Sequence, residues 1–238
     1  MPGRFSLLDD DASHTLLAKL GVDLGPLPTL YNIAPTDQIP VVHYFEGKRL
    51  ISSMRWWLIP QWSDGPSTKY PMFNARCERL LESRAFQGAF RYRRCIIPAS
   101  SFIEWQHDKT LDSKIPYQFS LESETLAFAG IWEYWSDGIQ HVLSCAIVNR
   151  TAPDCFADYA ARLPVVLTTE QAEFWLMEEY DTDALVALCE SAQPDVLQVA
   201  LLDAQLNDAR HKAEPVVLES LSAIDFKKER TVKARWTF

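Results

Sequence analysis

A series of apolar stretches joined by tight turns is the feature that most constrains the fold of this chain. The turn Glu46-Gly47-Lys48 separates two stretches rich in β-branched residues, which is typical of a β-hairpin. The turns Glu122-Ser123-Glu124 and Ser136-Asp137-Gly138 link three further apolar stretches in the same way. The expected strands cover residues 39–43, 50–54, 95–97, 117–121, 126–135 and 141–149.

Helical patterns are fewer and lie between or after these strands. Residues 9–20 begin with an acidic turn and carry one apolar face. Apolar residues also recur at helical spacing in 76–92. Residues 169–177, capped by Thr168 or Thr169, and residues 181–191 complete the expected set. The last 40 residues are mixed, with one short strand expected around 215–218.

These patterns predict an α+β fold with a mainly antiparallel sheet and peripheral helices. The 238 residues contain no internal repeat and no low-complexity linker, so we expect a single domain spanning residues 1–238. Apolar residues make up 47% of the chain, which is ample for a core. The eight Trp and 12 Phe exceed what a minimal core needs, so some aromatic side chains are expected on a binding surface.

Composition argues against several classes of protein. A net charge of −9 does not suit a protein that binds nucleic acid over its whole surface. The five cysteines show no CxxC spacing and the five histidines are scattered, so no disulfide framework, metal site or cofactor is expected. No apolar segment is long enough to span a bilayer. These features predict a soluble cytoplasmic protein.

Charge is nevertheless concentrated in one segment. Between residues 76 and 94 there are six arginines and two glutamates, in a chain that is acidic overall. Such a positive region suits contacts with phosphates. A solvated helix face with Glu–Arg pairs is the alternative, and the sequence leaves both interpretations open.

Individual residues also suggest chemistry. Glu104 sits between bulky apolar neighbours in Phe102-Ile103-Glu104-Trp105, where desolvation would raise its pKa and make it a candidate general acid or base. The alternative, which is the commoner case, is a strand glutamate that points to solvent. Asn32, in a turn before a strand, suits sugar or phosphate contacts. If Met1 is removed, Pro2 presents a secondary amine that can attack an aldehyde, as lysines do in Schiff-base enzymes.

Taken together, six segments in order resemble the SRAP family (SOS response-associated peptidase domain), which includes abasic-site processing proteins. The resemblance runs from residue 3 to about 170. It is carried by Gly3-Arg4-Phe5, Tyr31-Asn32-Ile33-Ala34-Pro35, Trp56-Trp57-Leu58-Ile59-Pro60-Gln61-Trp62, Asn74-Ala75-Arg76-Cys77-Glu78, Arg94-Cys95-Ile96-Ile97-Pro98-Ala99-Ser100-Ser101-Phe102-Ile103-Glu104-Trp105 and Ala160-Ala161-Arg162-Leu163-Pro164-Val165-Val166-Leu167.

The resemblance implies an α+β domain around a groove for single-stranded DNA. In the family pattern an N-terminal cysteine attacks the aldehyde of an abasic site and forms a thiazolidine crosslink. A family Asn and Glu position and protonate the sugar, and a His assists. Here Asn74 and Glu104 are kept, whereas Pro2 and Ala160 stand at the positions of the cysteine and the histidine.

Loss of the thiol and the imidazole favours a protein that binds abasic single-stranded DNA in the DNA-damage (SOS) response without making a thiazolidine. In this interpretation Arg4, Arg76 and Arg162 contact the backbone together with Asn32. Stacking platforms would come from Trp56, Trp57 or Trp62.

Two enzyme interpretations remain as alternatives. In the first, the Pro2 amine forms an iminium with the abasic aldehyde and Glu104 moves the protons, which allows a lyase reaction. In the second, Cys77 or Cys95 acts as the nucleophile of a thiol peptidase. Cys95 is expected in a buried strand and Cys77 has no histidine nearby in the sequence, so this second alternative has the weaker support.

Overall fold

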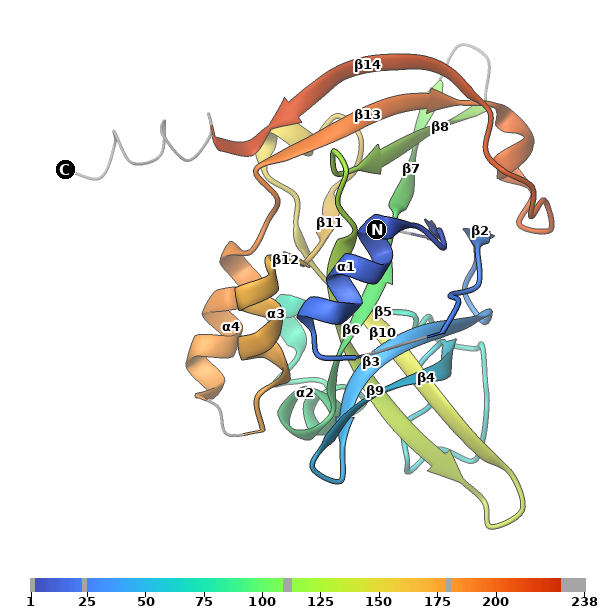
Figure 1. Ribbon diagram of the computed structural model, residues 1–238. Helices are drawn as coiled ribbons and strands as arrows, with labels where there is room; N and C mark the ends of the chain where they lie inside the picture. The colour runs from blue at the N-terminus through green and yellow to red at the C-terminus, as the bar shows by residue number, and fades with distance from the viewer. Residues whose placement is uncertain (1–2, 23–24, 109–112, 179–180, 228–238) are drawn as a thin grey trace.

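The computed structural model describes residues 3–22, 25–108, 113–178 and 181–227, which form two β-sheets flanked by helices (Figure 1). The first, sheet A, consists of β1 (Arg4–Leu7), β2 (Leu30–Ile33), β7 (Ser101–Asp108), β8 (Ser113–Ser120), β13 (Val196–Leu202) and β14 (Val217–Asp225). Its strand order is β14-β13-β8-β7-β1-β2. All of these neighbouring pairs are antiparallel.

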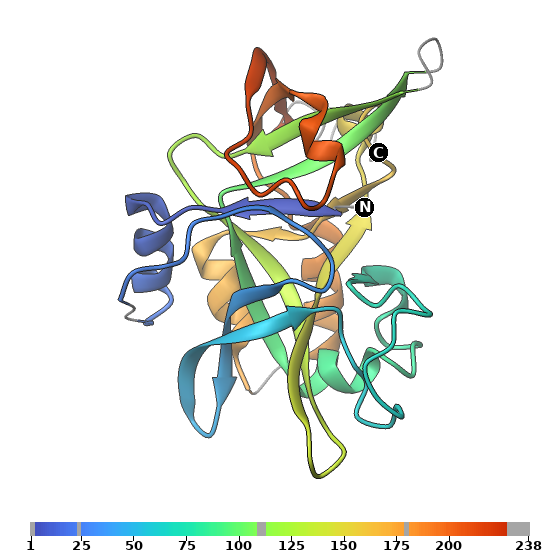
Figure 2. The same ribbon diagram turned by 90° about the vertical axis from the view of Figure 1, so that its right-hand side faces the viewer.

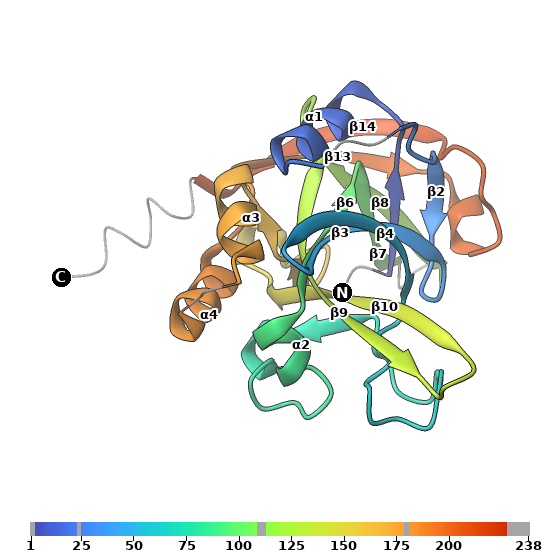
Figure 3. The ribbon, with the colours of Figure 1, turned by 60° about the horizontal axis from the view of Figure 1, so that its bottom comes forward.

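The second, sheet B, consists of β3 (Gln38–Phe45), β4 (Lys48–Trp56), β5 (Asn74–Arg76), β6 (Arg94–Ala99), β9 (Leu126–Ser136), β10 (His141–Thr151), β11 (Arg162–Pro164) and β12 (Val166–Leu167). Its strand order is β11-β10-β4-β3-β6-β9-β12, and β9 also pairs with β10. That extra pairing closes β10, β4, β3, β6 and β9 into a ring, which Figure 3 shows from below. Strand β10 runs parallel to β4 and β5, and the other neighbouring strands of sheet B pair antiparallel.

The predicted antiparallel α+β fold is therefore confirmed, with one difference in connectivity. The turn at 46–48 joins a true hairpin, β3 to β4, and the turn at 136–138 joins β9 to β10. The turn at 122–124 instead carries the chain from β8 in sheet A to β9 in sheet B. It passes through Ser123 at a φ of 58°, a left-handed conformation.

Most of the predicted helices are present, and their caps explain where they begin. The Asp10 side chain accepts a hydrogen bond from the Ser13 N–H (2.8 Å) at the start of α1. Thr168 and Gln171 form a capping box that starts α3, and Asp181 caps α4. The α-helices are α1 (Asp11–Lys19), α2 (Gln87–Tyr92), α3 (Thr169–Leu176) and α4 (Thr182–Ser191).

The helix predicted over residues 76–92 is wrong for most of its length. Asn74-Ala75-Arg76 forms the extended strand β5, because it pairs with residues 147–149 of β10. A single 3₁₀ turn, Cys77–Arg79, follows, and only α2 is α-helical. Helix propensity amounts to less than about 1 kcal/mol per ordinary residue, so pairing with a long strand outweighs it. After residue 195 the described part of the chain contains two strands, β13 and β14, where one was expected around 215–218.

Two apolar clusters hold these layers together. One lies between sheet B and the helices and includes Trp175, whose indole N–H donates to the carbonyls of Cys95 (3.0 Å) and Gly130 (3.1 Å). The other, which we name the inter-sheet core, lies between sheets A and B. Helix α1 and the segment 70–92 flank the molecule on opposite sides (Figure 2).

Candidate functional site

Glu104 occupies the face of β7 that points toward the inter-sheet core. Side chains alternate along a strand, so Phe102, Glu104 and Gln106 share one face. The Phe102 ring lies 6.2 Å from the Phe156 ring, and the Gln106 amide donates to the Asp158 carbonyl at 2.9 Å. Glu104, between these two contacts, therefore lies beneath the segment 156–160.

Burial changes the acidity of this carboxyl group. Glu104 is only 6% exposed, and desolvation raises its pKa from 4.5 to about 7. The sequence left open whether Glu104 points to solvent or is buried, and the structure buries it. A carboxyl group with this pKa is partly protonated at neutral pH, so it can either donate or accept a proton there.

Asn74 lies on the sheet B side of the inter-sheet core, whereas Glu104 lies on the sheet A side. It is buried at the first position of β5, next to Ile147 of β10. The preceding residue, Phe73, packs against Trp56 with ring centroids 5.7 Å apart, and the Trp56 indole donates to the Phe73 carbonyl at 2.8 Å. Trp56 in turn lies 5.0 Å from the ring of Phe5 in β1. Trp56 thus connects β1 to the strand that carries Asn74.

The tryptophans predicted as stacking platforms have very different exposures. Trp56 is fully buried and Trp57 is 9% exposed, so the structure offers neither ring to a nucleobase. Trp62 is 54% exposed, and the Arg84 guanidinium lies over its ring at 4.5 Å. Of these three residues, Trp62 keeps an accessible aromatic face.

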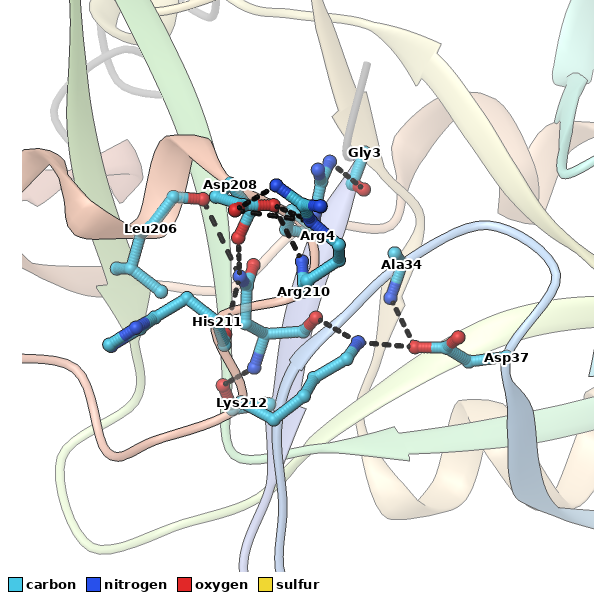
Figure 4. A network of polar contacts seen from close by, with 11 residues as sticks. Gly3, Arg4, Ala34, Asp37, Leu206, Asp208, Arg210, His211 and Lys212 are labelled. Atoms are coloured by element: carbon cyan, nitrogen blue, oxygen red, sulfur yellow. Dashed lines mark hydrogen bonds and ion pairs between the residues drawn. The ribbon is translucent and has the colours of Figure 1, made fainter.

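Asn32 has a structural role in this conformation instead of a place on the surface. It is fully buried at a φ of 47°. Its side-chain amide donates to the carbonyls of Asp208 (3.0 Å) and His211 (2.9 Å), and Lys212 donates to the Asn32 carbonyl (2.8 Å) and to Asp37 (2.6 Å), in the network of Figure 4. The predicted nucleic-acid contact is therefore replaced by a clamp on the segment 206–212.

Arg4 belongs to the same face of sheet A as this clamp. It pairs with Ile103 across β1 and β7, so its side chain points away from the face that carries Glu104. Its guanidinium lies over the Trp105 ring at 5.7 Å and close to Asp208 (Figure 4). Burial lowers the pKa of Arg4, while Asp37 and Asp208 act in the opposite direction.

Arg162 is largely occupied by an internal ion pair. Its two terminal nitrogens contact the two carboxylate oxygens of Glu78 at 3.0 and 2.7 Å, and its Nε donates to Asn149 at 3.0 Å. Partial burial opposes ionisation of Glu78, but the hydrogen bonds from Arg162 prevail and lower its pKa to about 2. Arg162, with 17% of its side chain exposed, mainly ties β11 to the turn after β5.

The predicted positive segment divides into structural and surface arginines. Arg94 is buried and donates to backbone carbonyls, including that of Trp175 at 2.7 Å, and Arg93 pairs with the buried Glu133 at 2.6 Å. The arginines on the surface are Arg76, Arg79, Arg84 and Arg91, which we name the arginine band.

The arginine band borders two hollows on either side of the turn at 83–86. The first, of about 480 Å³, is lined by Pro71, Phe73, Asn74, Arg76, Arg79, Ser83 and Phe86. The second, of about 420 Å³, includes Trp62, Arg84, Arg91 and Tyr92 among its lining residues. Cationic and aromatic side chains alternate along this surface, and the first hollow reaches Asn74.

Sequence reasoning missed two tyrosines beside Glu104. Tyr117 of β8 is the direct cross-strand partner of Glu104, and Tyr159 contacts Tyr117 with ring centroids 5.2 Å apart. The register of β7 and β8 brings them together, and no local motif reveals it. Ala160 follows Tyr159 and packs against the inter-sheet core.

The remaining predictions concern the N-terminus, metals and the membrane. Pro2 lies outside the described residues. Within the described ranges no group of three or more His, Cys, Asp and Glu side chains is arranged to hold a metal ion. No helix in the same part of the chain is long and apolar enough to cross a membrane.

The sequence places this arrangement in a known family. Residues 1–209 match the family described as SOS response associated peptidase (SRAP), and the chain belongs to that family. It is 33% identical over 227 residues to the abasic site processing protein YoqW of Bacillus subtilis, covering 92% of this chain and all of YoqW. It is 26% identical over 180 residues to abasic site processing protein HMCES of Mus musculus, covering 60% of this chain and 51% of that protein.

Solved structures share the fold. A crystal structure of a protein from Bacteroides thetaiotaomicron superposes with a TM-score of 0.72 at 20% identity, covering 88% of this chain and 99% of the other. A crystal structure of a phage-related protein from Bordetella bronchiseptica gives a TM-score of 0.64 at 22% identity, covering 81% and 89% of the two chains.

Proposed function

We propose that this protein binds single-stranded DNA and recognises abasic sites in it during the response to DNA damage, without forming a thiazolidine. The observation that carries the proposal is the arginine band, which leads to Asn74 at the edge of the inter-sheet core. The names of relatives such as YoqW support the substrate class. Pro2 has no thiol, and a thiazolidine needs one.

The chemistry of the arginine band suits a flexible single strand. Guanidinium groups neutralise backbone phosphates, and exposed aromatic rings such as Trp62 accept unstacked bases. Duplex DNA keeps its bases stacked inside the helix, so the same rings would find no partner in it. The band therefore favours single strands over duplexes, even though the whole protein is acidic.

Asn74 and Glu104 suit the sugar that remains at an abasic site. A ring-opened deoxyribose presents hydroxyl and aldehyde oxygens, which need hydrogen-bond donors. The Asn74 amide is one donor, and Glu104 in its protonated form is another because its pKa is about 7. We infer that the first hollow holds the neighbouring nucleotide while the sugar lies between these two side chains.

Replacing Arg76 with alanine is expected to weaken binding of single-stranded DNA about ten- to a hundredfold, since a charge-assisted contact contributes about 1.5–3 kcal/mol. The slope of log affinity against log salt concentration should fall by about 0.7, the value for one phosphate contact on a single strand. Fluorescence anisotropy over a range of salt concentrations measures both quantities.

The matched control for this test is Arg210→Ala. Arg210 is exposed and pairs with Asp208, and it lies outside the arginine band. Its removal should leave binding within twofold. If the wild-type protein binds duplex as tightly as single strands, or binds neither, the proposal is wrong.

A lyase reaction is the second candidate, favoured by the position of Glu104. Strand β1 begins at Arg4 opposite Ile103, so the start of the strand lies next to Glu104 and its raised pKa. The Pro2 nitrogen would add to the C1′ aldehyde to give a carbinolamine, and protonated Glu104 would donate its proton to the carbinolamine hydroxyl, which leaves as water. The Glu104 carboxylate would then take the C2′ proton of the resulting iminium, and the C3′–O bond would break to release the 3′ phosphate.

Borohydride separates the two candidates, because it reduces an iminium to a stable amine. Binding without chemistry predicts no covalent adduct on abasic single strands, with or without borohydride. The lyase predicts an adduct that appears only with borohydride and disappears when the N-terminus is acetylated. Denaturing gels detect the adduct, and mass spectrometry of the N-terminal peptide establishes whether the Pro2 amine is free.

A further inference from the structure

Tyr117 and Glu104 share one face of sheet A. They are directly opposed in the antiparallel pair of β7 and β8, and opposed residues project their side chains to the same side. Phe119, two residues further along β8, packs on Tyr159 with ring centroids 5.1 Å apart. The segment 156–160 therefore lies over both strands, above Glu104 as well as above Tyr117.

Tyr159 is held rigidly in that position. Its ring contacts those of Tyr117 (5.2 Å, 68° between planes) and Phe156 (5.8 Å). Its backbone N–H donates to the Phe156 carbonyl at 3.0 Å. The segment is also fixed to β7 by the hydrogen bond from Gln106 to Asp158. Tyrosine loses little conformational freedom when it binds a ligand, and here its ring is already packed on three sides.

Tyr159, and not its neighbour Ala160, carries a polar side-chain group at the edge of the inter-sheet core. Ala160 ends in a methyl group, and both residues are partly buried at the edge of the inter-sheet core. The hydroxyl of a buried or partly buried tyrosine usually finds a hydrogen-bond partner. Burial raises the pKa of Tyr159, as do the neighbouring Tyr117 and Asp158. The phenol therefore keeps its proton and remains a hydrogen-bond donor at neutral pH.

We propose that the Tyr159 hydroxyl, supported by the Tyr117 ring, recognises the oxygen on C1′ of an abasic deoxyribose placed beside Glu104. An intact nucleotide carries a base nitrogen at C1′, so this oxygen is the atom that distinguishes an abasic site. Tyr159 is thus a specificity-determining residue. The inference rests on the proposed function, because it requires that an abasic strand binds at this edge of the core.

The test compares three single strands of one sequence. One carries a borohydride-reduced abasic site, which keeps an oxygen on C1′ but has no reactive aldehyde. The second carries a tetrahydrofuran analogue, which has no hydroxyl on C1′, and the third is intact. Wild-type protein should bind the reduced site about three- to tenfold more tightly than the analogue, the range for one neutral hydrogen bond.

Tyr159→Phe keeps the ring contacts and removes the hydroxyl, so it should erase this preference while binding the intact strand as wild type does. Tyr134→Phe is the control, because the Tyr134 hydroxyl bonds to His141 (2.6 Å) in the hairpin of β9 and β10. A preference that survives in Tyr159→Phe, or is absent in wild-type protein that binds all three strands, overturns the inference alone. Failure of the wild-type protein to bind any strand overturns both proposals.

Discussion

Replacing Trp56 with alanine is expected to lower the free energy of unfolding by about 3–5 kcal/mol, the usual cost of removing a large aromatic side chain from a core. Trp56 is fully buried between Phe5 and Phe73, and its indole N–H would no longer satisfy the Phe73 carbonyl. Because Phe73 precedes Asn74, the cavity also loosens the strand that carries a site residue. Chemical denaturation followed by tryptophan fluorescence and circular dichroism measures the loss.

Trp62→Ala is the matched comparison, because it is expected to change stability little and to weaken DNA binding. Trp62 is 54% exposed, so stability should change by no more than about 0.5 kcal/mol. Binding of single-stranded DNA should weaken by about 1–3 kcal/mol, the usual contribution of one stacked base. A loss of stability below about 1 kcal/mol for Trp56→Ala, or unchanged DNA binding for Trp62→Ala, would contradict the roles given to the two rings.

This pair of tryptophans shows where the sequence was and was not informative. Both lie within seven residues in one family motif, and composition does not distinguish one tryptophan from the other. Exposure decides their roles, and it depends on which distant segments cover each ring. Asn32 makes the same point, since the carbonyls that bury its amide come from Asp208 and His211, 176 and 179 residues away.

Elements defined by local chemistry were predicted well. The Glu46-Gly47-Lys48 turn, the acidic start of residues 9–20 and the cap at Thr168 involve residues a few positions apart, so the sequence alone identifies β3, β4, α1 and α3. Residues 76–79 were mistaken for the start of a helix, because the strand that pairs with Asn74–Arg76 lies some 70 residues later. Non-local pairing of this kind leaves no periodic signal in the segment itself.

For the candidate site as well, some residues were identified from the sequence and others were missed. Family motifs identified Asn74, Glu104 and Arg76 as candidates, but whether the pKa of Glu104 is shifted depends on burial, which the sequence does not show. Tyr117 was invisible to this reasoning, because it becomes a neighbour of Glu104 only through the register of two strands. Strand register is set by the whole sheet, and no short motif encodes it.

Replacing Glu104 with glutamine is expected to stabilise the protein increasingly as pH rises. The folded protein holds the Glu104 proton up to about pH 7, whereas the unfolded chain releases it near pH 4.5. Between these values the folded state binds more protons than the unfolded state, so wild-type stability falls as pH rises and the penalty is constant above pH 7. The full penalty is at most about 3 kcal/mol, since one pKa unit corresponds to about 1.4 kcal/mol.

Urea denaturation of both proteins at pH 5 and pH 8 tests this, with Glu78→Gln as a control of opposite sign. Glu78 has a lowered pKa of about 2, so its ion pair with Arg162 stabilises the fold above pH 4.5 and is lost only as pH falls toward 2. Glu78→Gln should therefore destabilise the protein at both pH values. If the difference between Glu104→Gln and wild type is the same at pH 5 and pH 8, Glu104 titrates normally. It would then be ionised at neutral pH and could not protonate a sugar oxygen there, which removes the acid that both candidate functions require.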